Sequence, residues 1–103
     1  MIRCEYIHGG EFEFEAGGSV SALKVVYHRS EREWRSGDDR KVIWICHALT
    51  ANSDAEDWWP ELVGPGKLFD TEKYFVVCAN MLGSAYGSSG PATENPVTGQ
   101  PYY

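Results

Sequence analysis

Two short, continuously apolar runs constrain the fold of this chain more than any other feature. They are Val42 to Cys46 and Tyr74 to Ala79, and neither alternates between apolar and polar residues. Such runs are typical of strands that are covered on both faces, as in a parallel sheet. Because residues 47–73 are long enough for a strand-to-strand crossover, we expect the two strands to lie parallel in one sheet.

The turn after the first run is the best place in the chain to build a site. A strand that stops at His47 delivers this side chain and the backbone of residues 48–50 to one point. In α/β folds, ligands bind at the carboxyl ends of strands. A general base would also need a nucleophile and an orienting carboxylate, and no spacing here supplies both. We therefore interpret His47 as a structural residue.

Residues before Val42 predict antiparallel strands. Glu11 to Glu15 alternates acidic and aromatic residues, and Gly9-Gly10 before it favours a tight hairpin back to Arg3 to Ile7. Leu23 to His28 is β-branched and aromatic, which predicts a third strand. The charged residues 29–41 that follow are expected to form a solvated surface loop.

A change in the spacing of the apolar residues predicts a helix between Ser53 and Leu62. Asp54 or Ser53 can cap it, and Glu56 and Asp57 would lie in its first turn. Its apolar face would consist of Trp58, Trp59, Leu62 and Val63. Asp54, Glu56 and Asp57 could also form a metal site. Because no histidine lies at ligand spacing, a helix amino terminus explains these acidic residues better. Pro60 limits how far the helix can extend.

The Gly- and Pro-rich residues 81–103 show no apolar periodicity and predict a loop tail. The glycines from Gly83 to Gly90 follow a strand, but they lack the lysine of a P-loop and the offsets of a dinucleotide fingerprint. No Gly-x-Ser-x-Gly elbow is present either. Ser84, Ser88 and Ser89 are therefore interpreted as loop serines.

Composition excludes several classes of protein. The 103 residues are 43% hydrophobic and suffice for one domain with a core, while a net charge of -6 disfavours nucleic acid and anionic membranes. No apolar run approaches the roughly 20 residues of a membrane span, and no signal peptide is evident, so we expect a cytoplasmic protein. We expect Cys4, Cys46 and Cys78 to be small buried apolar residues that neither form disulfides nor bind zinc.

Several short segments, taken in order, carry a family resemblance. They are His47-Ala48-Leu49-Thr50, Trp58-Trp59, Gly64-Pro65-Gly66-Lys67, Asp70-Thr71, Tyr74 to Asn80, Leu82-Gly83, Tyr86 to Pro91 and Asn95 to Tyr102. In order and spacing they resemble the homoserine O-acetyltransferases of methionine biosynthesis, which are acyltransferases on the α/β-hydrolase fold. The resemblance is loose before Val42 and close after it.

The resemblance implies that the chain is the amino-terminal part of such a fold. Residues 1–41 would supply antiparallel strands, residues 42–80 a strand-helix-strand unit and residues 81–103 a loop tail. The family transfers an acetyl group from acetyl-CoA through a serine to L-homoserine, and binds no permanent cofactor or metal. The catalytic Ser, Asp and His would all fall after Tyr103, so the chain alone should be inactive.

The resemblance also assigns site residues. The backbone amide of Leu49 would form half of the oxyanion hole, and the acyl pocket would be lined by Ala48, Thr50 and Ala51. Structural positions near the site would be His47, Asn80, Gly83, Gly87 and Gly90. Residues 51–54 and Ser84-Ala85 depart from the family pattern. Two questions therefore stay open: whether the donor carries an acetyl or a succinyl group, and which hydroxyl compound accepts it.

By the same resemblance, Val42 to Cys46 would lie beside a nucleophile strand outside this chain. If the chain ends at Tyr103, this strand would be an unpaired edge, and the sheet would lack the helices that cover its faces, which would expose Trp44, Phe75 and Val77. The chain should then self-associate or bind a complementing carboxyl-terminal fragment. Two other functions stay open from the sequence. One is a non-catalytic interaction or assembly module, and the other is part of an α/β-fold ester hydrolase.

Overall fold

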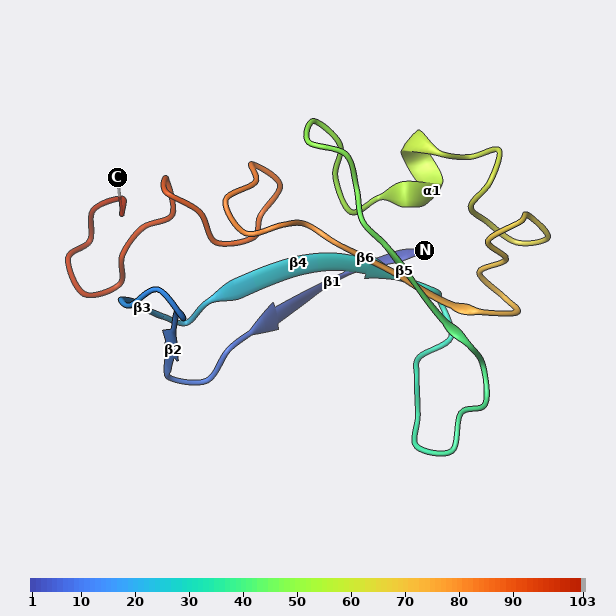
Figure 1. Cartoon of the computed structure of the whole chain (residues 1–103), viewed down its shortest axis with the longest axis horizontal. Coiled ribbons are helices and arrows are strands. Elements are labelled where there is room, and N and C mark those ends of the chain that lie inside the picture. Colours follow the sequence, from blue (N-terminus) through green and yellow to red (C-terminus); the bar gives the residue numbers. More distant parts are fainter. Residues whose placement is uncertain (103) are drawn as a thin grey trace.

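The computed structural model describes residues 1–102, which form a four-stranded mixed sheet, a two-stranded sheet and one short helix (Figure 1). The elements are β1 (Ile2–Ile7), β2 (Glu11–Glu13), β3 (Ser19–Ser21), β4 (Lys24–Arg29), β5 (Val42–Ile45), α1 (Ala55–Trp58) and β6 (Phe75–Ala79). The order in the larger sheet is β1-β4-β6-β5. The strands of residues 42–80 thus lie beside the antiparallel strands of the amino-terminal part.

The two apolar runs form parallel neighbours, as the sequence predicts. Val42 pairs with Phe75 and Ile45 pairs with Cys78, so β5 and β6 run in register and end at the same edge of the sheet. On the other side, β6 pairs with β4 in the antiparallel sense. This arrangement brings the turns after β5 and β6 together.

The predicted hairpin between Arg3 to Ile7 and Glu11 to Glu15 is wrong. β1 pairs with β4 instead, and β2 pairs with β3. The glycine pair that turns a hairpin is Gly17-Gly18, where both residues have positive φ values of 94° and 84°. Two Gly-Gly signals lie close together in this sequence, and the local pattern does not distinguish which pair closes a hairpin.

The predicted helix is much shorter than Ser53 to Leu62. It comprises Ala55–Trp58, and Asp54 precedes it without a side-chain capping hydrogen bond. Pro60 has no N–H to donate to the preceding turn and disfavours helical backbone at Trp59, whose φ and ψ are -132° and 50°. Trp58 and Trp59 still pack against the core, as their apolar character predicts.

The two faces of the larger sheet differ in cover. α1 and the segment after it lie on one side in Figure 1, where the buried core consists of Ile45, Ala55, Val63, Val76 and Cys78. On the other face Trp44 is 62% exposed. Within residues 1–102, the predicted cover on both faces of β5 is therefore not found, and Trp44 is exposed, as the family resemblance led us to expect.

The exposure predicted for Phe75 and Val77 is not observed, and the charged loop of residues 30–41 folds against Phe75. Trp34 packs on Phe75 with ring centroids 5.4 Å apart, and the Arg40 guanidinium lies 5.2 Å from the Phe75 ring centroid. Val77 is only 7% exposed. The loop is thus partly structural rather than simply solvated.

Arg40 organises that loop. Its guanidinium donates to both carboxylate oxygens of Asp38 and to the carbonyl oxygens of Arg32 and Glu33. The hydrogen bonds from the Arg40 guanidinium to the Asp38 carboxylate hold the pKa of Asp38 down to about 2. The arrangement keeps Trp34 in place over Phe75.

Across residues 1–102, no helix is long and apolar enough to cross a membrane.

Candidate active-site edge of the sheet

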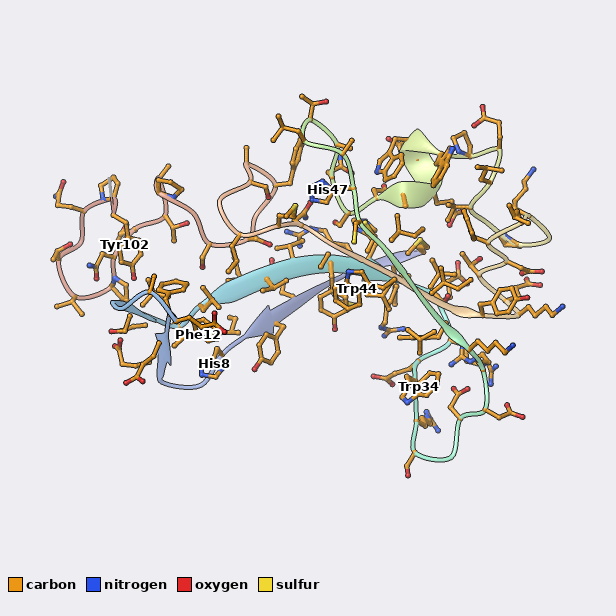
Figure 2. All side chains as sticks on the ribbon, in the orientation of Figure 1. His8, Phe12, Trp34, Trp44, His47 and Tyr102 are labelled. Atoms are coloured by element: carbon orange, nitrogen blue, oxygen red, sulfur yellow. The ribbon has the colours of Figure 1, made fainter. Side chains whose placement is uncertain are left out.

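The candidate site lies where β5 and β6 end. His47 follows β5 and is 8% exposed, and Asn80 follows β6 and is 2% exposed. His47 lies on the same side of the sheet as α1 in Figure 2, whereas Trp34 lies on the opposite side. Because the strands are parallel, both residues are delivered to one edge, as the sequence predicts.

Asn80 joins three segments through its side chain. Its Oδ1 accepts from the Ser53 backbone N–H at 2.8 Å, and its Nδ2 donates to Ser53 Oγ at 2.9 Å and to the Tyr86 carbonyl at 3.1 Å. The segment before α1 and the loop after β6 are therefore fixed to the same side chain. This geometry gives a physical basis to the structural role expected of Asn80.

His28 extends this network, although its place in the sequence indicates only the end of a strand. Ser53 Oγ accepts from Asn80 Nδ2 and has one proton of its own, which it can donate to His28 Nδ1 at 2.7 Å. Asp54 lies 3.8 Å from the other ring nitrogen. Burial lowers the pKa of His28, and the nearby Asp54 carboxylate only partly opposes this. A neutral His28 fits the hydrogen bond from Ser53.

Residues 48–51 form a tight turn that holds Leu49 outward. The Ala48 carbonyl accepts from the Ala51 N–H at 2.9 Å. The Leu49 side chain is 98% exposed, and within residues 1–102 no group accepts a hydrogen bond from its N–H. The turn therefore presents a free amide at the edge of the sheet, beside the exposed Thr50 and the half-buried Ala51.

Two of the three singled-out glycines after β6 are required by close packing. A Cβ at Gly87 would lie 2.7 Å from Val26 Cγ2, and φ at Gly87 is +105°. A Cβ at Gly90 would lie 3.0 Å from the Cα of Gly83. The loop after β6 folds back on itself and on β4 because these positions lack side chains.

Ser88 and Ser89 complete the edge of β4. Ser88 Oγ accepts from the Val26 N–H at 2.9 Å and donates to the Asn80 carbonyl at 2.8 Å, and Ser89 Oγ accepts from the Lys24 N–H at 2.8 Å. The two hydroxyls thus accept hydrogen bonds from β4 backbone N–H groups that a neighbouring strand would otherwise accept, at residues beyond the end of β6. Their hydroxyls are committed to the backbone, which agrees with their interpretation as loop serines.

No group of three or more metal-ligating side chains occurs among the described residues. The three cysteines are free thiols in residues 1–102. Cys78 is fully buried, and burial raises its pKa to about 11. Cys46 is exposed and Cys4 is half-buried, so the expected burial holds only for Cys78.

Comparison with known proteins identifies the family. No protein-family model matches the chain. A homoserine O-acetyltransferase of Haloarcula marismortui is 42% identical over 105 residues, covering 90% of this chain and 25% of the relative. One from Nostoc punctiforme is 47% identical over 91 residues, covering 88% of this chain and 25% of the relative. The crystal structure of homoserine O-acetyltransferase from Bacillus anthracis matches 98% of this chain and 30% of that one, with 32% identity and a TM-score of 0.78.

The chain belongs to the homoserine O-acetyltransferase family. It spans about a quarter of the length of the curated relatives that it matches. Its mixed sheet is the corresponding part of the α/β-hydrolase fold, as predicted. Esterase E22 also matches, with 26% identity and a TM-score of 0.74 over 98% of this chain and 32% of that one. The fold is thus shared by acyltransferases and esterases.

Proposed function

We propose that this chain is the amino-terminal segment of a cytoplasmic homoserine O-acetyltransferase, which transfers an acetyl group from acetyl-CoA to L-homoserine. The observation that carries the proposal is identity of 42 to 47% to curated members of that family over about nine-tenths of the chain. Acetyl-CoA is a substrate in this proposal, and no permanent cofactor is required.

The chemical contribution of this segment is one backbone amide. The Leu49 N–H is unpartnered within residues 1–102 and lies at the strand edge where the α/β-hydrolase fold places its chemistry. It would donate to the oxygen of the acyl group as negative charge develops there. Removing one such donor costs about 2.7 to 4 kcal/mol of transition-state stabilisation in comparable sites.

The remaining groups would come from residues after 103. We propose that the nucleophilic serine lies on a Gly-x-Ser-x-Gly type elbow about 40 to 60 residues further on, and that the catalytic Asp and His follow it. The small Ala48 lets the acyl group approach the backbone, and Thr50 and Ala51 would line the acyl pocket. On this account residues 1–103 alone have no transferase activity.

The open face of the sheet would be covered by the same later residues. Tyr6, Val25, Tyr27, Trp44 and Phe75 line a shallow groove there. Apolar sheet faces are normally covered, and the relatives are about four times as long as this chain. In isolation, the segment should self-associate or bind a complementing carboxyl-terminal fragment.

The test is a product assay on the full-length protein. Purified enzyme is incubated with acetyl-CoA and L-homoserine, and O-acetyl-L-homoserine is measured by mass spectrometry, with succinyl-CoA and L-serine as matched alternative substrates. Acetyl transfer to L-homoserine is expected to dominate. Absence of any acylated amino acid would contradict the proposal.

An ester hydrolase is the second candidate, and the likeness to esterase E22 favours it specifically. The same purified protein is offered a short-chain aryl ester with and without L-homoserine. Hydrolysis at the same rate in both conditions, with no acylated homoserine, would identify a hydrolase. A catalytically silent protein that forms a stable, saturable complex with a different protein would instead indicate an assembly module.

A further inference from the structure

The ring of His47 links the two turns at the candidate site. Its Nε2 lies 3.1 Å from the Met81 backbone N, and its Nδ1 lies 2.8 Å from the Ala48 carbonyl oxygen. A backbone N–H can only donate, so Nε2 accepts, and Nδ1 therefore carries the proton and donates to Ala48. Both ring nitrogens are occupied, which leaves no free lone pair for proton transfer.

The contact with Ala48 fixes the direction of the Leu49 amide. The Ala48 carbonyl and the Leu49 N–H belong to one planar trans peptide unit, in which the two groups point in opposite directions. Two donors hold the carbonyl, namely His47 Nδ1 and the Ala51 N–H at 2.9 Å. Holding the carbonyl inward keeps the N–H directed away from the protein.

We propose that His47 is a positioning residue for acyl transfer, because its Nδ1–H clamps the Ala48–Leu49 peptide and so aims the Leu49 amide. This inference rests on the proposed function. It assigns to the imidazole no direct contact with substrate. It also predicts that the two ring nitrogens are not equivalent in importance, since only Nδ1 contacts the peptide that carries the amide.

Three variants of the full-length enzyme test the inference. In His47→Asn, the side-chain amide can occupy the position of Nδ1 and keep the donor to Ala48. In His47→Gln, the longer side chain reaches the position of Nε2 and keeps only the acceptor for Met81. His47→Ala keeps neither contact, and all three remove the imidazole.

We expect kcat to fall in the variants that lose the hydrogen bond to the Ala48 carbonyl and to recover in the variant that keeps it. His47→Ala and His47→Gln should lose about 10- to 100-fold in kcat, the scale expected when a catalytic group is displaced by about 1 Å. Their KM values for acetyl-CoA and L-homoserine should stay within about threefold of the parent. His47→Asn should recover most of kcat, whatever its melting temperature.

Two results would overturn the inference. One is an unchanged kcat in His47→Ala, and the other is equal kcat in the Asn and Gln variants with losses that follow only the melting temperature. If the parent enzyme transfers no acyl group, the proposed function fails, and the geometry is still tested by long-range ¹H–¹⁵N NMR of the ring. A proton on Nδ1 supports the clamp, and a ring protonated only on Nε2 contradicts it.

Discussion

At Leu49 the backbone amide, and not the side chain, is the proposed functional group. Leu49→Pro in the full-length enzyme removes the N–H and should lower kcat for acetyl transfer by about 100- to 1,000-fold. Leu49→Ala is the matched control, because it keeps the amide and trims a side chain that is 98% exposed in this segment. The measurement is steady-state kinetics, with melting temperatures to confirm that both variants fold. Equal losses in the two variants would argue against an oxyanion role.

The loop after β6 gives a second residue-scale prediction. Gly87→Ala should unfold more easily than Gly83→Ala, although both residues have positive φ. The shared backbone strain costs about 1 to 2 kcal/mol. The clash of the new Cβ with Val26 at Gly87 adds about 1 to 3 kcal/mol, whereas at Gly83 the new Cβ meets nothing within 4 Å. Denaturant unfolding of the two variants measures the difference, and equal stabilities would contradict the packing argument.

Single residues show where sequence reasoning succeeds. Although the roles of His47 and Asn80 stay predictions, their place at the ends of neighbouring strands was predictable, because each follows an apolar run. The bond from Ser53 to His28 was not, because it joins residues that are 25 positions apart. A capping serine and a strand histidine each have a local interpretation, and nothing in either segment indicates that the two meet.

At the scale of elements, continuous apolar runs are more reliable than turn signals. β5 and β6 were predictable because both are continuously apolar and are separated by the length of a crossover, although Val42 and Trp44 of β5 are exposed. The partner of β1 was not predictable, because β1 pairs with residues beyond the β2–β3 hairpin. The helix was overestimated, because Pro60 ends it after one turn.

The loop of residues 30–41 makes a pH prediction. The pKa of Asp38 is lowered from 3.8 to about 2, so its charged form stabilises the fold above about pH 4, and this contribution is lost as the pH falls toward 2. Asp38→Asn should therefore lower the melting temperature at pH 7, and the difference from the parent should shrink as the pH approaches 2. The exposed Asp39→Asn is the control and should follow the parent throughout. A deficit in Asp38→Asn that stays constant with pH would contradict the role of the charge.

At the scale of the whole molecule, the sheet has one covered and one open face. Residues 1–103 alone should show a mass in sedimentation equilibrium that rises with concentration, because Trp44 and its neighbours form an exposed apolar surface. Trp44→Lys should shift this equilibrium toward the monomer. Leu68→Lys changes a residue that is 68% exposed and does not line the open face, so it should leave association unchanged. Equal behaviour of the two variants would show that the open face is not the contact.

The central claim is that this segment supplies part of an acyl-transfer site that later residues complete. The most direct measurement is formation of O-acetyl-L-homoserine from acetyl-CoA by residues 1–103 alone, by the remainder of the full-length protein alone, and by the two together. The account predicts product only from the mixture, with the full-length enzyme as the positive control. Product formed by residues 1–103 alone would contradict it.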